Sequence, residues 1–319
     1  MRMRTLVLAA ASIGALLLSS LTVTAPAQAA SSPASTGEIA PKITPVRGVG
    51  SGLGYASGTY RGTGDTTFHG GKVMTASTTN VYVIWYGNWA TTNATNLLKR
   101  NIINGSLAGI GGSAYYNINT TYTDSAGAAV KNSVTYNQAT GQYTPGGAYK
   151  KTLADKDIAS IVKTAITGGK LPLDANAVYF VFTSSDIALS SGFLTRYCGW
   201  HTYQTVNNTS IKYSFVGDAG KKLSACANQT TSSPNGDPAA DGMVSVIAHE
   251  LEEAVTDPEL NAWYDSTGYE NADKCAWYFG ATSTATNGSK YNVVWNGMQF
   301  LVQQNWVNTG ATSHCDMSY

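Results

Sequence analysis

One stretch of the chain places a histidine and several carboxylates at helical spacing. Residues 241–258 read DGMVSVIAHELEEAVTDP, in which His249 and Glu253 are four positions apart. Side chains four positions apart lie on the same face of an α-helix, so both can reach a single metal ion. In helices of the HExxH type, the glutamate after the first histidine is the general base that activates water, and Glu250 has this position. The spacing therefore predicts a metal site suited to hydrolysis.

Glu253 replaces the second histidine of that pattern, which changes the ion that the site would prefer. A carboxylate oxygen is an accepted zinc ligand. A site built from a histidine and a pair of carboxylates is more negative than a site built from a pair of histidines and a single carboxylate. The extra negative charge weakens the Lewis acidity of the ion and favours harder cations. We expect Zn²⁺, with Mn²⁺ or Ca²⁺ as alternatives.

A third ligand must come from elsewhere in the chain. The acidic residues after the helix are Asp265, Glu270 and Asp273. Gly268 permits a tight turn that would bring Glu270 back toward His249. We therefore predict Glu270 as the third ligand, with Asp273 as its hydrogen-bonding partner or as the alternative ligand. His201 is a further candidate from an earlier part of the chain.

Other interpretations of these residues compete with the metal site. A pattern of this kind also occurs on ordinary charged surface helices. The apolar stretch 243–248 argues against that reading, because it predicts a buried helix in which an unpaired carboxylate is costly. His69 and His314 are expected to be structural or exposed. Nucleophile-based hydrolysis is disfavoured, because the sequence has no GxSxG motif, and phosphate-loop and dinucleotide motifs are also absent.

The elements that must position these residues alternate between strands and helices. Apolar, β-branched runs predict buried strands over residues 80–86, 177–183 and 212–216. Helical periodicity predicts helices over residues 94–107, 157–166 and 238–256. Shorter strands are expected near 291–303. This order predicts a single α/β domain over residues 67–319, with a mixed sheet, flanking helices and, by analogy, a zincin-like placement of the active helix.

The N-terminal region has the composition of an exported protein. Arg2 and Arg4 precede an apolar stretch over residues 6–18, and the small-residue pattern at 27–29 follows, so we predict a signal peptide over residues 1–29. Residues 30–66 are rich in Ser, Pro, Gly, Ala and Thr and predict a flexible leader or pro-segment. The mature protein is expected to be secreted.

Charge and cysteine content narrow the partners and the compartment. The 20 basic and 19 acidic residues nearly cancel, so no basic field is available for nucleic acid or an anionic membrane. No later stretch is apolar enough for a membrane span. Four cysteines allow three pairings, of which the simplest joins Cys198 to Cys226 and Cys275 to Cys315. Zinc bound by these thiolates is disfavoured, since no CxxC pair is present and exported thiols oxidise.

Several short motifs, in order along the chain, resemble the phosphate-induced-protein (EXORDIUM) family over about residues 67–317. They are residues 69–71 (HGG), 81–89 (VYVIWYGNW), 198–201 (CGWH), 233–237 (SPNGD), 241–243 (DGM) and 255–258 (VTDP). The resemblance implies an extracellular or cell-wall protein linked to growth and nutrient responses, with no enzymatic activity firmly attached. Plant members lack the pair His249-Glu250, and this segment is instead similar to a metallopeptidase-like pattern of microbial relatives.

The leading hypothesis from the sequence is a secreted, metal-dependent, peptidase-like hydrolase. In it, His249, Glu253 and Glu270 bind Zn²⁺, Glu250 is the general base, and His201 contacts the substrate or transition state. Its partner would be an extracellular peptide or a cell-wall polymer. The alternative is a non-catalytic extracellular protein of the EXORDIUM type. A third hypothesis, carbohydrate binding, is suggested by the seven tryptophans and 19 tyrosines.

Overall fold

A mixed sheet of seven strands organises the part of the chain that the structure, a computed structural model, describes, namely residues 42–45 and 64–319. The described residues form one compact unit. The strands, in their order across the sheet, are β1 (Lys42–Pro45), β9 (Tyr197–Val206), β10 (Thr209–Gly217), β7 (Ala177–Thr183), β3 (Thr79–Tyr86) and β4 (Val134–Thr135), with β5 (Gln142–Tyr143) also paired to β3. The predicted signal peptide and most of the predicted leader lie outside the described residues.

The central strands are parallel and buried on both faces. β3 and β7 pair in parallel, β10 pairs in parallel with β7, and β9 is antiparallel to β10. The runs VYVIWY and AVYFVFT are apolar at nearly every position, as expected for strands that are covered on both sides. The mixed α/β class predicted from the sequence is confirmed.

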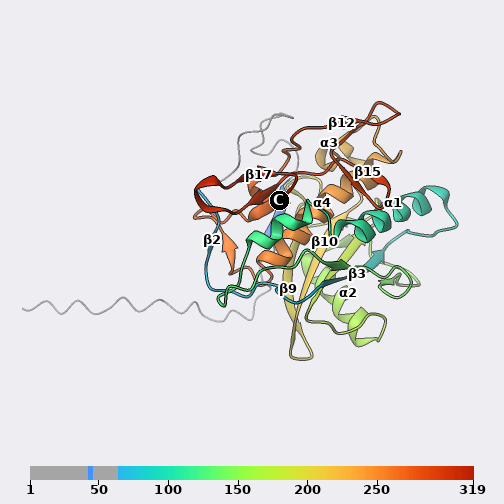
Figure 1. Ribbon diagram of the computed structural model, residues 1–319. Helices are drawn as coiled ribbons and strands as arrows, with labels where there is room; N and C mark the ends of the chain where they lie inside the picture. Colours follow the sequence, from blue (N-terminus) through green and yellow to red (C-terminus); the bar gives the residue numbers. More distant parts are fainter. Residues whose placement is uncertain (1–41, 46–63) are drawn as a thin grey trace, which may run out of the picture. The chain divides into compact units, whose positions relative to one another are not determined.

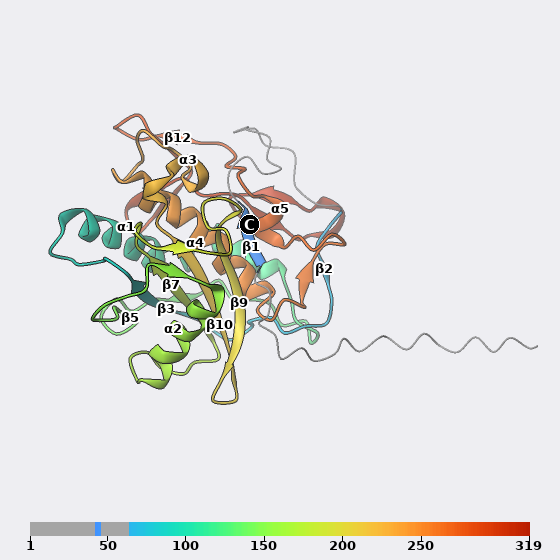
Figure 2. The same ribbon diagram turned by 180° about the vertical axis from the view of Figure 1, so that it is seen from behind.

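Helices cover the two faces of this sheet (Figures 1 and 2). Within β9, the Gln204 amide donates to the carbonyl of Ala159 in α2 (Asp155–Thr167), 2.9 Å away. His201 lies an odd number of residues away and therefore points to the opposite face, where its imidazole meets Glu250 of α4 (Pro238–Thr256). On that second face α1 (Ala94–Ile110) packs against α4.

α4 is an almost completely buried helix. Asp237 caps its N-terminus by accepting hydrogen bonds from the N–H groups of Ala239 and Ala240, and Pro238 occupies the first turn. Every residue from Ala239 to Thr256 is buried. The helix ends just before Pro258, which cannot continue it. The carboxylates of α4 therefore face the interior of the protein and not the solvent.

Short elements complete the described structure. The remaining strand pairs are β2 (Thr67–Phe68) with β11 (Trp263–Tyr264), β6 (Thr152–Leu153) with β8 (Ala188–Leu189), β12 (Ser283–Thr284) with β13 (Lys290–Tyr291), β14 (Val293–Trp295) with β15 (Met298–Phe300), and β16 (Asn305–Val307) with β17 (His314–Asp316). The short helices are η1 (Tyr116–Thr121), η2 (Ala219–Lys221), α3 (Leu223–Cys226), α5 (Asn271–Lys274) and η3 (Gly310–Thr312).

Both predicted disulfides are present. Cys198–Cys226 joins β9 to α3, and Cys275–Cys315 joins the residue after α5 to β17. Disulfides of this kind are typical of proteins from oxidising compartments and are consistent with an extracellular protein. In the described residues, no helix is both long enough and apolar enough to cross a membrane.

Two neighbouring strands at one edge of the main sheet, β9 and β1, differ from the expectation. β9 was not anticipated, because its sequence YCGWHTYQTV has no continuous apolar run. β1 lies inside the stretch predicted to be a flexible leader, yet residues 42–45 pair with β9 and extend the sheet by one strand. The ordered structure thus includes a segment that precedes the predicted start of the domain at residue 67.

Candidate metal centre

Three elements bring six histidine and acidic side chains, all of types that can ligate a metal, into one buried cluster. β9 provides one histidine, α4 provides a histidine and two glutamates, and the start of α5 provides two more carboxylates. The six residues are His201, His249, Glu250, Glu253, Glu270 and Asp273, of which only Asp273 has any measurable exposure, at 7%. α4 and α5 are in contact, so the chain after α4 returns Asp273 to His249 and Glu270 to His201.

His249, Glu253 and Asp273 form the first set of potential ligands. Nε2 of His249 lies 2.9 Å from Oε1 of Glu253 and 3.5 Å from Oδ1 of Asp273. One donor atom from each residue lies within 4.8 Å of the other two, close enough to share an ion. The backbone N–H of Asp273 donates to Oε1 of Glu253 at 3.0 Å, which holds α5 against α4.

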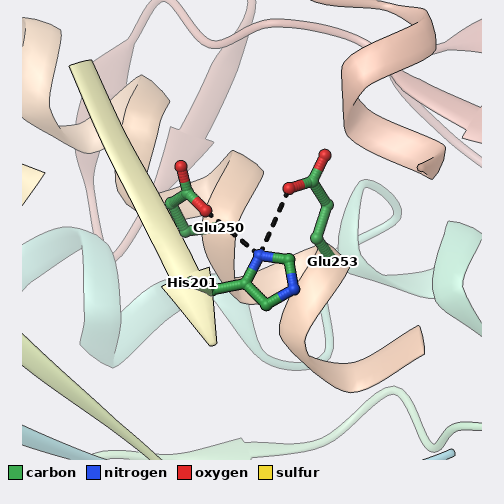
Figure 3. A group of neighbouring side chains, drawn as sticks. All are labelled: His201, Glu250 and Glu253. Carbon is green, nitrogen blue, oxygen red and sulfur yellow. Dashed lines mark hydrogen bonds and ion pairs between the residues drawn. The ribbon is translucent and has the colours of Figure 1, made fainter. Parts of the chain in front are cut away.

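His201, Glu250 and Glu253 form the second set, which shares Glu253 with the first. Figure 3 shows the imidazole of His201 between the two carboxylates, with Nδ1 facing both. Nδ1 lies 3.3 Å from Oε2 of Glu250 and 3.4 Å from Oε2 of Glu253. On the other side of the ring, Nε2 lies 3.6 Å from Oε1 of Glu270. Glu253 therefore turns one oxygen toward each histidine.

A residue from the N-terminal strand also reaches this cluster. The hydroxyl of Thr44 in β1 donates a hydrogen bond to Oε1 of Glu250, and Thr44 is fully buried. Glu250 thus has one oxygen toward His201 and the other toward β1. Nothing in the sequence pointed to Thr44, because the contact joins residues 206 positions apart and depends on strand pairing.

The charges in the cluster are unbalanced. In the described structure, Glu250, Glu253 and Asp273 form ion pairs only with His201 and His249. With Glu270, which faces Nε2 of His201, four carboxylates meet two imidazoles, so the set is negative when the acids are ionised, even with both rings protonated. A buried excess of negative charge is costly in the interior, and a bound cation would offset it.

The pKa values of these histidines and carboxylates are shifted because the groups are buried next to one another. Burial alone would lower the pKa of His201 and His249, but the carboxylates around them raise both pKa values well above the usual one. Burial raises the pKa of Glu250 and Asp273, and the charge of Glu253 adds to the effect. Burial also acts to raise the pKa of Glu253, but the two histidines lower it to about 2. Glu253 is thus the most strongly ionised member.

The cluster contains nitrogen and oxygen atoms that could ligate a divalent cation. Nδ1 of His249 and Nε2 of His201 are fully buried and have no hydrogen-bond partner within the described part of the chain. Leaving such a group unsatisfied costs about 1–3 kcal/mol. Imidazole nitrogen and carboxylate oxygen are together the donor types of zinc and manganese sites. The residues present therefore suit such an ion.

The structure places the other candidate residues as follows. Asp265 lies outside the cluster and pairs with Lys274 at 3.2 Å. His69 is exposed and stacks on Tyr264, and His314 is exposed, as expected for both. Asp273 lies nearer to His249 than the preferred ligand Glu270, which faces His201.

Glu252, which the sequence argument did not use, is buried on another side of α4. It accepts a hydrogen bond from the Tyr115 hydroxyl at 3.0 Å. Burial raises its pKa well above the usual value. The run of charges at residues 252–253 is therefore not a solvated surface, although the sequence allowed that interpretation.

Comparison with known proteins identifies the family. The conserved region described as phosphate-induced protein 1 matches residues 66–318 of this chain. The chain belongs to that family. It is 29% identical to EXORDIUM-like 3 of Arabidopsis thaliana over 285 residues (78% of this chain and 81% of the relative) and 30% identical to EXORDIUM-like 5 of the same plant over 273 residues (75% and 74%). No solved structure gave a significant match.

The family resemblance inferred from the short motifs is thereby confirmed. The match covers all the residues of the cluster but begins after β1. The names of these relatives state no chemical activity, so the function has to be argued from the site itself.

Proposed function

We propose that this protein is a secreted, metal-dependent hydrolase that acts on peptide bonds. The observation that carries the proposal is the buried meeting of two histidines with an excess of carboxylates, in which one ring nitrogen of each histidine has no hydrogen-bond partner among the described residues. The two disulfides and the apolar N-terminal sequence support secretion.

Each side chain has a defined task in this proposal. His249, Glu253 and Asp273 would hold Zn²⁺, with Mn²⁺ or Ca²⁺ as alternatives. The ion, when bound, polarises a carbonyl group and lowers the pKa of water. Glu250 accepts a proton from the attacking water at Oε2, the oxygen that faces the cluster, and donates it afterwards to the leaving amine. His201, 3.3 Å away, would orient that carboxylate and contact the reacting group.

Metal content and one conservative substitution test the proposal. Purified full-length protein is expected to contain about one equivalent of zinc, measured by plasma mass spectrometry. It should cleave denatured casein, and a chelator should abolish this activity. Glu250→Gln should keep the metal, since the ligands assigned above are untouched, yet lose about 100-fold or more in kcat/KM.

A matched control and a clear failure complete this test. Glu259→Gln changes an acid that pairs with Lys72 at the surface, and should alter neither metal content nor activity. Only trace metal in the purified protein, or full activity in Glu250→Gln, would contradict the proposal.

A second function is favoured by the complete burial of the cluster. A non-catalytic extracellular protein could use the same residues to hold a structural ion, and closed sites of this kind stabilise folds. In that case zinc binds with the same stoichiometry and its removal unfolds the protein, but no polypeptide is cleaved. Carbohydrate binding through a tryptophan surface has less support. Six of the seven tryptophans are buried: Trp85, Trp89, Trp200, Trp277, Trp295 and Trp306.

A further inference from the structure

The outer edge of β9 is filled by a strand from a distant part of the chain. β1 pairs antiparallel with β9, with Lys42 opposite His201 and Thr44 opposite Gly199, and the register shifts at Pro45 (Figure 2). β1 is the last strand on this side of the sheet. Without it, β9 would present a row of unpaired backbone N–H and C=O groups, which is a template for another extended chain.

The position of β1 relates this edge directly to the candidate metal centre. Residues directly opposite each other in an antiparallel pair have side chains on the same face. Gly199 has no side chain, and a Cβ atom there would lie 3.1 Å from Oε1 of Glu250. The gap that this glycine leaves lets the side chain opposite it, Thr44, reach Glu250. An added strand is therefore held with one side chain against the proposed general base.

β1 also stands apart from the conserved region. The family match begins at residue 66, whereas β1 ends at Pro45. The strand that completes the edge is thus outside the region that defines the family, while β9, α4 and α5 are all inside it.

We infer that the edge of β9 is a binding site for an extended polypeptide and that residues 42–45 occupy it as an internal blocker. The inference rests on the proposed function in one respect, namely that it identifies the bound polypeptide as the substrate. A substrate would pair with β9 as β1 does, with a small side chain opposite Gly199. While β1 is in place, its Thr44 hydroxyl engages the carboxylate that should take up the proton from water.

Opening the edge in the full-length chain tests the inference. Thr44→Glu places a second carboxylate against Glu250 in a buried position, so β1 should detach. A fluorescent peptide with the sequence of residues 38–49 should then bind this chain about tenfold more tightly than it binds the wild-type chain, measured by fluorescence anisotropy. The Thr44→Ser chain keeps the hydroxyl, so β1 should stay in place. This chain should bind the peptide as weakly as the wild-type chain does. A control peptide with the substitution Thr44→Glu should bind none of the three chains, wild type or variant.

If the Thr44→Glu variant does not fold, a second variant, which can be cut by a protease, tests the same inference. A recognition sequence for a specific protease replaces residues 50–56, and the protein is cut after it has folded. The labelled peptide should then displace the severed N-terminal segment, which is detected as a released fragment by size-exclusion chromatography. A folded, cut protein that neither releases the segment nor binds the peptide would overturn the inference.

The binding readout separates this inference from the proposed function. Peptide binding at the opened edge requires neither metal nor catalysis. Binding without cleavage of casein contradicts the hydrolase proposal and leaves the binding site intact. Metal-dependent cleavage that is the same in wild-type, Thr44→Glu and cut protein contradicts the role of β1 as a blocker and leaves the hydrolase proposal intact.

Discussion

At the scale of single residues, Glu253 connects the two halves of the candidate metal centre. Its Oε1 faces His249 and the backbone of Asp273, and its Oε2 faces His201. A histidine at this position could not turn one oxygen toward each imidazole. Glu253 in place of the second histidine makes the helix less similar to an HExxH helix. The same replacement lets one residue belong to both ligand sets.

Asp273 is expected to matter directly for metal affinity. Asp273→Asn keeps the size of the side chain but removes the charge 3.5 Å from Nε2 of His249, so zinc affinity should fall about tenfold or more. Isothermal titration of the full-length chain in a competing chelator measures the change. Glu259→Gln, which alters a carboxylate paired with Lys72 at the surface, is the control. Equal affinities in Asp273→Asn and wild type would exclude Asp273 as a ligand.

Gly199 is expected to tolerate no side chain. A Cβ atom there would lie 2.6 Å from Cγ1 of Val246 and 2.9 Å from the carbonyl oxygen of Phe215. Gly199→Ala should therefore lower the free energy of unfolding by about 1–3 kcal/mol, measured by urea denaturation. Gly146→Ala is the matched control, because a Cβ atom there meets nothing within 4 Å. Equal stability of both variants would show that β9 and α4 can move apart at this point.

At the scale of elements, α4 depends on the helices and strands around it. A helix that buries three glutamates and a histidine is unfavourable unless its neighbours supply partners. β9 supplies His201, α5 supplies the Asp273 N–H group, and Tyr115 supplies a hydroxyl for Glu252. The polar face of α4 is thus matched to specific neighbours rather than to solvent.

The helix on the opposite face, α2, should show a simple pH dependence. Asp157 accepts hydrogen bonds from Lys150 and from the backbone N–H of Ala154, and these contacts lower its pKa below 3.8. Its ionised form therefore stabilises the fold above about that pH, and this contribution is lost as the pH falls through the lowered pKa. Asp157→Asn should cost about 1 kcal/mol at neutral pH.

Urea unfolding at a series of pH values checks this prediction. The difference between wild type and Asp157→Asn should shrink toward zero below the lowered pKa of Asp157. Lys163→Gln, a change at an exposed position later in the same helix, should show no such convergence. A difference that stays constant with pH would contradict the assigned role of the carboxylate.

At the scale of the whole molecule, the candidate metal centre unites distant segments of the chain. Residues 44, 201, 250 and 273 meet in one place, although they belong to β1, β9, α4 and α5. Each disulfide fastens one of these segments, since Cys198 lies in β9 and Cys275 directly follows α5. An ion held by His249, Glu253 and Asp273 would link α4 to α5 directly, and Glu253 would connect it to His201 of β9.

Zinc should therefore raise the thermal stability of the entire domain. At a free zinc concentration of about 100 Kd, binding to the native state alone adds about 2.7 kcal/mol. For a domain of this size, the gain corresponds to a rise in Tm of roughly 5–10 °C. Differential scanning calorimetry of chelator-treated protein, with and without added zinc, measures the rise. The Asp273→Asn variant should show a smaller one, and an unchanged Tm in the wild type would argue against a bound ion.

The sequence by itself determined the elements and the chemistry that α4 could offer. Continuous apolar runs predicted β3 and β7, and the spacing of His249 and Glu253 predicted that their side chains would be neighbours, as they are at 2.9 Å. The cysteine pairing was also correct. These features depend on local periodicity or on proximity along the chain, which the order of the residues contains.

Only the tertiary structure decided which distant residues complete the cluster. β9 lacks an apolar run because it carries polar residues on both faces: His201 meets α4 and Gln204 meets α2, and these contacts are defined only once the helices have packed on the sheet. Asp273 rather than Glu270 lies beside His249, because the direction of α5 sets which acid returns to α4. The contact of Thr44 with Glu250 depends on strand pairing across most of the chain. Such long-range pairings arise from the packing of the whole fold and leave no local pattern in the sequence.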